Sequence, residues 1–311
     1  MADAAAELVK RSGLRARGAS IASIAVYVDF DPGSDGRIKI AADWAAKFGA
    51  ALIGVTGWLP GREAGGWFEY ELGRPDRADR IMGELEKLAE HFRSLVRHKV
   101  ETVEWRASFH FPREVIPAEA RAADLVIIGP RTVAEDAYHA FDAGEVLLKA
   151  GRPVLVVPDG VTSNPGERIL IAWKDTREAR HAVQDALPYL TAAKDITLVQ
   201  IAEEVEERAA VAQLDDVERY LVRHGIEVRA KSVLHPKGSI ADQLRNVAKN
   251  EGADLIVAGA YGHTRLGEWL RRRNPRSVAR RRRVLSFFEL SGSLPCAARF
   301  ARNLSLLLRW H

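Results

Sequence analysis

The stretch Ala123-Asp124-Leu125-Val126-Ile127-Ile128-Gly129 decides the fold, because it returns as Ala253-Asp254-Leu255-Ile256-Val257-Ala258-Gly259. A second pair of segments also matches, namely Ile24–Asp29 (IAVYVD) and Leu170–Asp175 (LIAWKD). Both matches fall in the same order along the chain, so the sequence contains two copies of one unit. The first copy is longer, and the Gly/Pro-rich segment 58–75 is the natural place for its additional residues.

Short β-branched runs alternate with helix-length amphipathic stretches in both copies. The sequence predicts strands at 23–29, 51–57, 101–107, 124–129, 153–157, 168–173, 195–201, 226–233 and 254–259. It predicts helices at 34–48, 76–98, 112–122, 140–149, 176–191, 205–224 and 239–251. Apolar strands separated by helices are typical of a parallel sheet that helices cover on both faces. We therefore expect an α/β protein with two tandem open parallel-sheet domains.

The domain boundaries follow from the turn-rich segment 158–166 (PDGVTSNPG). We expect an N-terminal lead-in at 1–20, a first domain at 21–158, a linker at 159–166, a second domain at 167–290 and a tail at 291–311. Tyr27 and Trp173 fall at matching positions of the repeat, which favours core packing for both.

Composition excludes several classes of protein. The chain has 311 residues, of which 47% are hydrophobic and 28% charged, as in ordinary soluble globular proteins. A single cysteine, Cys296, excludes a disulfide within the chain and fits a reducing compartment. Without a CxxC or HExxH motif, no metal site is expected. No apolar run approaches the ~20 residues that a transmembrane helix needs, so we expect a cytoplasmic protein without a membrane partner.

Familiar catalytic motifs are absent from the sequence. It has no GxSxG, no GxxxxGK[ST] and no GxGxxG, and no carboxylate or histidine pair whose spacing demands acid–base chemistry. We therefore assign no catalytic residue and do not expect an enzyme.

A candidate nucleotide site lies at the ends of two predicted strands of the second copy. Ligands of open α/β sheets bind at the carboxyl ends of the strands. There, the carboxylate of Asp175 can accept hydrogen bonds from ribose hydroxyls, and Gly259 and Gly262 let backbone N–H groups approach phosphate. His263 and Arg265 add donors. The alternative interpretation is that Asp175 caps the following helix and that the glycines only turn the chain.

These segments resemble the universal stress protein family in its tandem two-domain form, over about residues 20–269. The matching segments are Ala123–Gly129, Gly151–Pro158, Ile169–Asp175, Gly238–Ala241 and Ala253–Trp269. The resemblance implies Rossmann-like domains of the adenine-nucleotide-hydrolase-like type, with five parallel strands each, paired through their last strands. It further implies a cytoplasmic, non-catalytic stress-response protein that can form a homodimer and, in some members, binds ATP or AMP.

The chain departs from the pattern of the nucleotide-binding members, which have a third glycine nine residues after the second. Here that position is Arg272, so the part of the loop that approaches the phosphates is missing and we expect weak or absent ATP binding. In the first copy Asp29 is kept, but Gly129-Pro130 has no second glycine and Pro130 lacks an N–H donor. We assign no nucleotide site to the first copy.

The last part of the chain differs in composition from the rest. Residues 270–311 contain eleven arginines and one acid, Glu289, although the whole chain has a net charge of only +4. This composition is typical of an altered reading frame, and the alternative is a selected basic arm that binds nucleic acid. No aromatic residues interleave with Arg280–Arg283, which argues against nucleic-acid binding. Val284–Phe288 is expected to serve as the last strand of the second copy.

Two further functions stay open at this point. One is a nucleotide hydrolase or transferase on the same scaffold, and the other is nucleic-acid binding through the arginine-rich tail.

Overall fold

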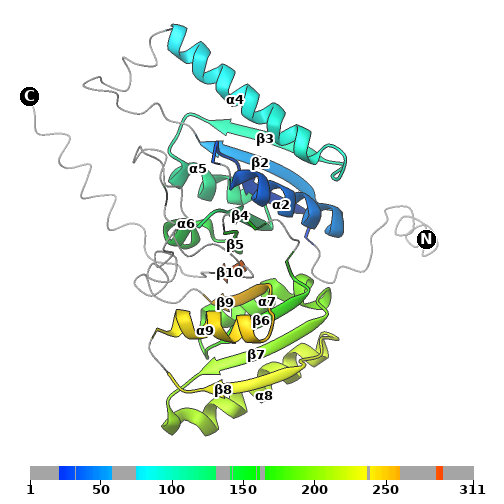
Figure 1. Cartoon of the computed structure of the whole chain (residues 1–311), viewed down its shortest axis with the longest axis vertical. Coiled ribbons are helices and arrows are strands. Elements are labelled where there is room, and N and C mark those ends of the chain that lie inside the picture. The colour runs from blue at the N-terminus through cyan, green and yellow to red at the C-terminus, as the bar shows by residue number, and fades with distance from the viewer. Residues whose placement is uncertain are drawn as a thin grey trace, which may run out of the picture.

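The protein is an α/β structure built on one ten-stranded sheet with helices on both of its faces (Figure 1). The structure is a computed structural model, and it describes residues 21–31, 33–57, 75–130, 141, 143–158, 160–161, 165–236, 239–259 and 285–289. The expected fold class, parallel strands covered by helices, is confirmed.

The first half of the molecule contains strands β1 to β5 and their helices. Its strands are β1 (Ser23–Tyr27), β2 (Ala51–Gly57), β3 (Val103–Ser108), β4 (Leu125–Ile128) and β5 (Val154–Val156). Its helices are α2 (Ser34–Phe48), α4 (Pro75–Val96), α5 (Pro112–Glu119), the 3-10 turn η1 (Ala120–Ala122) and α6 (Ala143–Ala150). Buried residues of α2 and α4 cover one face of these strands, and buried residues of α5 and α6 cover the other.

The second half contains strands β6 to β10. Its strands are β6 (Arg168–Trp173), β7 (Asp195–Ile201), β8 (Ala230–Leu234), β9 (Leu255–Gly259) and β10 (Leu285–Glu289). Its helices are α7 (Arg177–Thr191), the 3-10 turn η2 (Glu204–Glu206), α8 (Glu207–Arg223) and α9 (Ile240–Asn250). The elements lie where the sequence predicts them. The largest difference is at β8, which begins at Ala230 instead of residue 226.

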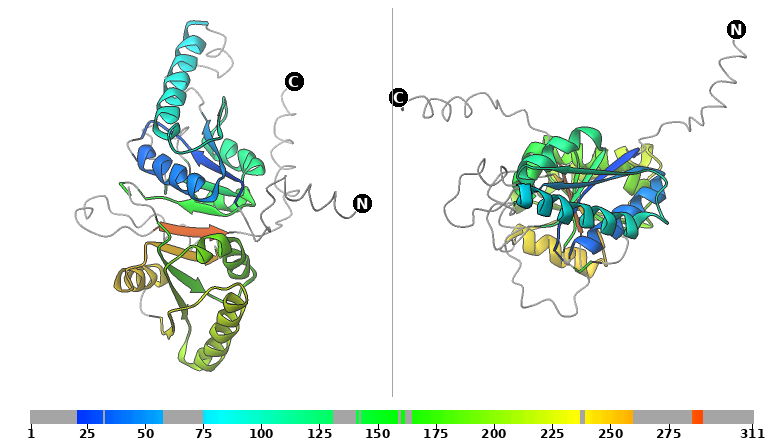
Figure 2. Two further views of the ribbon diagram at one scale, coloured as in Figure 1. Left: turned by 90° about the vertical axis from the view of Figure 1, so that its right-hand side faces the viewer. Right: turned by 90° about the horizontal axis from the view of Figure 1, so that it is seen from above.

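The strand order is β3-β2-β1-β4-β5-β10-β9-β6-β7-β8, so each half has the same order and the second reads in reverse. All neighbouring strands are parallel except β5 and β10, which are antiparallel and join the halves at the centre of the sheet (Figure 2). The carboxyl ends of the strands therefore lie at one edge of the sheet in the first half and at the opposite edge in the second.

Strand β10 is the last strand that the sequence places at Val284–Phe288. Its backbone pairs with β9 from Leu285 to Glu289 and with β5 from Ser286 to Phe288. Neither β5 nor β9 therefore has an unpaired edge at this position. Because one sheet runs through both halves, the domain boundaries at 158–166 and 290 stay a prediction.

The register of the strands corrects the sequence alignment of the two copies by one residue. Ile24 pairs with Leu125, and Ile169 pairs with Leu255. Since Leu125 and Leu255 are equivalent in the repeat, Ile24 corresponds to Ile169, and the match of Ile24 with Leu170 is wrong.

This shift moves side chains to the other face of the sheet, because successive residues of a strand alternate. Tyr27 packs against the ring of Phe141, with ring centroids 5.2 Å apart, whereas Trp173 belongs to the cluster that α7 covers. The predicted equivalence of Tyr27 and Trp173 is therefore wrong, although both are buried as expected. The equivalent of Trp173 is Val28, and that of Asp29 is Lys174.

The repeated aspartates of the Ala-Asp-Leu segments tie strands together at their amino ends. Asp254 Oδ1 and Oδ2 accept hydrogen bonds from the backbone N–H groups of Gly166, Glu167 and Arg168, at 2.9–3.2 Å. Asp124 Oδ2 does the same for Ala22 and Ser23. These carboxylates thus join the start of β6 to β9 and the start of β1 to β4, at the ends of the strands opposite to their carboxyl ends.

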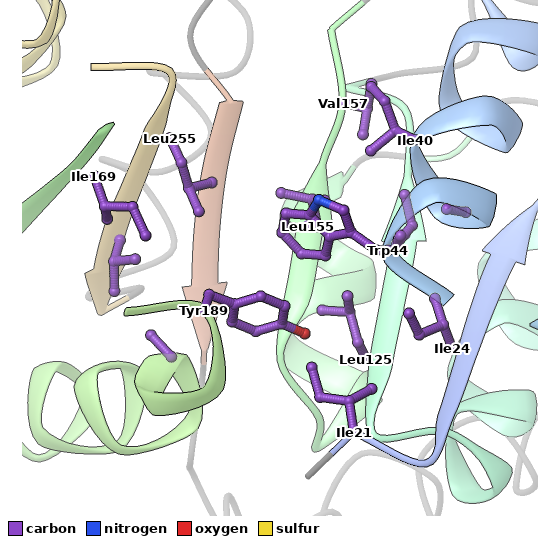
Figure 3. Packing of buried hydrophobic residues seen from close by; sticks show 14 of the residues in the cluster. Ile21, Ile24, Ile40, Trp44, Leu125, Leu155, Val157, Ile169, Tyr189 and Leu255 are labelled. Atoms are coloured by element: carbon purple, nitrogen blue, oxygen red, sulfur yellow. The ribbon is translucent and has the colours of Figure 1, made fainter. Parts of the chain in front are cut away.

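An aromatic cluster joins the two halves on one side of the central strands (Figure 3). The ring centroids of Trp44 on α2 and Tyr189 on α7 are 4.5 Å apart. The rings of Phe48 and Tyr189 pack edge to face, with centroids 5.4 Å apart. The indole N–H of Trp44 donates to the carbonyl of Pro165, at 3.3 Å, so the connecting segment is also held by α2.

Candidate functional site

The strand order changes direction between β1 and β4 in the first half and between β6 and β9 in the second. The carboxyl ends of these strand pairs are where open α/β sheets bind ligands. Of the predicted site residues, the structure places Asp175 just beyond β6 and Gly259 at the end of β9. Gly262, His263 and Arg265 lie outside the described residues.

Asp175 is a surface carboxylate beside the start of helix α7. Its Oδ1 accepts a hydrogen bond of 2.5 Å from Arg180, and the two side chains are 45% and 58% exposed. The residue that caps α7 is Thr176, whose hydroxyl oxygen accepts from the backbone N–H of Ala179 at 3.3 Å. The alternative prediction that Asp175 caps this helix is therefore wrong, and its carboxylate is accessible to a ligand.

Gly259 allows helix α7 to lie directly on the end of β9. A Cβ atom at this position would come within 2.4 Å of the backbone nitrogen of Ala179 and 2.6 Å of the carbonyl carbon of Glu178. Helix packing alone therefore requires a glycine here, a reason that neither interpretation of the glycines anticipated.

The corresponding place in the first half is filled by a buried cation, Arg37 of α2. Its Nε donates to the carbonyl of Tyr27 at 2.8 Å, and its Nη2 lies 3.0 Å from Asp29 Oδ2 and 3.3 Å from Ser34 Oγ. The side chains of Arg37 and Asp29 are 4% and 12% exposed. A Cβ atom on Gly129 would come within 2.6 Å of Arg37 Nη1, so the guanidinium also lies against the end of β4.

Burial raises the pKa of the Tyr27 phenol far above its ordinary value, and the nearby charge of Asp29 adds to this effect. The first-half carboxylate Asp29 is thus already engaged by Arg37.

Arg37 is not among the site residues predicted from the sequence, although the sequence contains a signal for it. Arg37 lies on the same face of α2 as Ala41 and Trp44, four and seven positions on, and both of these are buried. A lone arginine in an apolar helical stripe indicates a buried cation that needs a carboxylate partner.

The second half contains no buried charged side chain among its described residues, and instead leaves two buried polar atoms unpaired. These are the indole nitrogen of Trp173, the last residue of β6, and the amide oxygen of Gln200, the last but one of β7. The amide nitrogen of Gln200 donates to Gln213 Oε1 of α8 at 2.8 Å.

The described residues contain neither a metal site nor a helix suited to span a membrane. No group of three histidine, cysteine or acidic side chains there is arranged to hold a metal ion. None of the described helices combines the length and the apolar character that crossing a membrane requires.

Comparisons with known proteins give a fold and no family assignment. No family model and no curated protein sequence matches the chain. Among solved structures, a universal stress protein from Archaeoglobus fulgidus is similar, with a TM-score of 0.64 and 15% identity over 87% of this chain and 97% of that one. A protein of unknown function from Pseudomonas aeruginosa aligns with a TM-score of 0.53 and 13% identity, over 86% of this chain and 92% of that one. At these identities the likeness establishes a shared α/β architecture along nearly the whole chain.

Proposed function

We propose that this chain is a non-catalytic stress-response protein of the universal stress type. The observation that carries the proposal is the similarity to the Archaeoglobus fulgidus universal stress protein, which covers 87% of this chain and therefore extends over both halves. Two of the segments that resemble the family in sequence support it, because Ala123–Gly129 and Ala253–Gly259 contain strands β4 and β9 and the aspartates that join neighbouring strands in both halves.

We further propose that the protein binds an adenine nucleotide, ATP or AMP, weakly and in its second half only. The first-half position is occupied by the Arg37–Asp29 pair, which a ligand would have to displace at the cost of leaving a buried charge unpaired. In the second half Asp175 is exposed and can accept hydrogen bonds from a ribose. Gly262, His263 and Arg265 are proposed to contribute phosphate contacts.

The test is calorimetric titration of the full chain with ATP and with AMP in the presence of Mg²⁺. We expect a dissociation constant weaker than about 1 μM, because Arg272 replaces the third glycine of the loop. Asp175→Ala should weaken binding further. Asp216→Ala is the matched control, because Asp216 is also an exposed partner of an arginine but lies on α8.

Unchanged affinity in Asp175→Ala would remove the second-half site. Sustained ATP turnover that disappears in Asp175→Ala would replace the proposal with a nucleotide hydrolase. Salt-sensitive binding of nucleic acid that is lost on deletion of residues 270–311 would instead point to the arginine-rich tail.

A further inference from the structure

Strand β8 forms one edge of the sheet, because β7 is its only neighbour among the described strands (Figure 1). The carbonyl of Leu234 accepts a hydrogen bond from the backbone N–H of Ala202, at 2.9 Å. Leu234 therefore turns its backbone groups toward β7, and because successive residues of a strand alternate, Lys231 and Val233 turn theirs away. Such an edge can form hydrogen bonds to one further strand.

Helix α8 lies beside this edge and presents a stripe of side chains along it. Lys231 Nζ lies 2.6 Å from Asp215 Oδ1 and also contacts Glu218, so both carboxylates are on the flank of α8 that adjoins β8. Val211 and Val222 lie one helical turn before and after these carboxylates and extend the same stripe. They are 45% and 56% exposed, although both are apolar. The α8 stripe thus has an apolar residue at each end and one net negative charge in its middle.

The tail at 291–311 has the opposite charge. It contains three arginines and no acid, whereas residues 203–218 contain seven acids and one base. Within the tail, Phe300, Arg302 and Leu304 alternate with small residues. In an extended strand these three side chains point to one face, in the order apolar, basic, apolar. This order complements the α8 stripe.

The tail is also long enough to reach this edge. Strand β10 ends at Glu289, and a strand added beyond β8 would lie five strand positions away, or about 24 Å. The eleven residues that follow Glu289, up to Phe300, span as much as about 36 Å when extended. Along the edge, the three alternating side chains cover about 13 Å of strand, close to the ~16 Å of helix that the α8 stripe spans.

We propose that residues 299–305 of the tail add to β8 of the same chain as an antiparallel edge strand, an inference that does not depend on nucleotide binding. Strand β10 ends at the carboxyl edge of the second half, because it is parallel to β9. The tail therefore approaches β8 from the carboxyl end of that strand and runs antiparallel to it.

The direction of the added strand fixes its contacts with the α8 stripe. Helix α8 connects the parallel strands β7 and β8 and so runs opposite to them. Phe300 then contacts Val211, and Leu304 contacts Val222. Arg302 lies between them, at the two carboxylates that otherwise share a single lysine.

The other edge of the sheet, strand β3, lacks this charge complementarity. Arg106 of β3 binds Glu104 and Glu119, at 2.7 and 2.8 Å. Arg121 also binds Glu119, at 3.0 Å. Two cations balance two carboxylates in this group, so it offers a basic segment no net opposite charge.

The experiment measures hydrogen exchange of the backbone amides of Lys231 and Val233 by NMR, in the full chain and in two charge variants. Arg302→Glu should raise both exchange rates about tenfold or more, because it places a third carboxylate against the stripe. Arg299→Glu is the matched control, because it changes the charge of the tail equally but lies at a position that points away from α8. It should change the rates less than about twofold.

Two additions to the full-length Arg302→Glu protein test the pairing from the other side. Adding Glu218→Lys reverses both charges and should restore slow exchange of the two amides. Adding an excess of a synthetic peptide with the sequence of residues 291–311 should restore it as well, because the vacated edge can accept the peptide. Circular dichroism melts identify any variant that does not fold.

The remaining outcomes overturn the inference. Amides of Lys231 and Val233 that exchange as fast in the wild type as in Arg302→Glu would refute the added strand. Equal loss of protection in Arg302→Glu and Arg299→Glu would indicate attraction by charge alone and would refute the proposed contacts. Protection that increases with protein concentration, together with a dimer in sedimentation, would mean that the tail of a second copy occupies the edge.

Discussion

Replacing Arg37 by methionine tests whether the ion pair of Arg37 and Asp29 at the strand ends of the first half is buried and stabilises the fold. The change removes the hydrogen bonds to Tyr27 O and Ser34 Oγ and leaves the carboxylate of Asp29 without its cation. Removing one partner of a buried ion pair costs about 3–5 kcal/mol. Because Asp29 retains 12% exposure and can recruit some water, we expect a loss of unfolding free energy near the lower limit, about 3 kcal/mol.

The assay is urea unfolding followed by circular dichroism, since guanidinium salts would screen the ion pair and mimic the missing side chain. Asp29→Asn and the double variant complete a thermodynamic cycle, and the double variant should lose less than the sum of the single losses. Arg180→Met removes an exposed cation from Asp175 and should cost at most about 1 kcal/mol. A cost below about 1 kcal/mol for Arg37→Met, or full additivity in the cycle, would refute the reasoning.

Three other predictions follow from the strand ends and the buried tyrosines. Asp254→Asn should lower the unfolding free energy by about 1–3 kcal/mol, because it weakens three backbone hydrogen bonds to a carboxylate. A midpoint of urea unfolding equal to that of the wild type would contradict this. Gly259→Ala should lower the unfolding free energy by about 1–3 kcal/mol or more, because its methyl group would collide with the backbone of α7. The control Gly83→Ala lies at an open, exposed helical position and should raise the unfolding free energy by about 0.5–1 kcal/mol. Similar midpoints of urea unfolding for both variants would contradict the packing argument. Burial raises the pKa of Tyr27 and Tyr189 above that of an unfolded tyrosine, so the unfolded chain loses the phenolic protons first as the pH rises. The contribution of each tyrosine to the unfolding free energy is therefore complete below about pH 10 and declines above it by about 1.4 kcal/mol per pH unit. Urea unfolding between pH 9 and 11 measures this slope, and the corresponding phenylalanine variants should each remove one such contribution.

The sequence predicts most of the fold because the information is periodic and repeated. The segments around Leu125 and Leu255 identify two copies, and the alternation of apolar strands with amphipathic helices determines the parallel sheet. Even β10 is predicted, from five residues within an arginine-rich segment.

The register of the repeat could not be obtained in the same way. Aligning Tyr27 with Trp173 and Asp29 with Asp175 maximises chemical similarity. The strand pairing instead makes Val28 equivalent to Trp173, and Asp29 equivalent to Lys174. A shift of one residue leaves the hydrophobic pattern nearly unchanged in strands that are buried on both faces. Only the pairing with β4 and β9 resolves it.

The candidate site was predicted only in part, for a related reason. Asp175 and Gly259 stand out because they follow strands, but the partners of a buried atom depend on residues far away in the sequence. The contact of Gly259 with Ala179 and the unpaired atoms of Trp173 and Gln200 come from packing between strands and helices. No local pattern records these relations.

The antiparallel meeting of β5 and β10 gives the molecule a pseudo-twofold axis through the centre of its sheet. In a dimer of identical subunits, such an axis would force the same residues onto both sides of the interface. Covalent linkage of the halves removes that constraint. One side can then contribute Trp44 and the other Tyr189 to the same contact. The strand ends of one half can hold the buried cation Arg37, whereas the described residues at the strand ends of the other half include no buried charge.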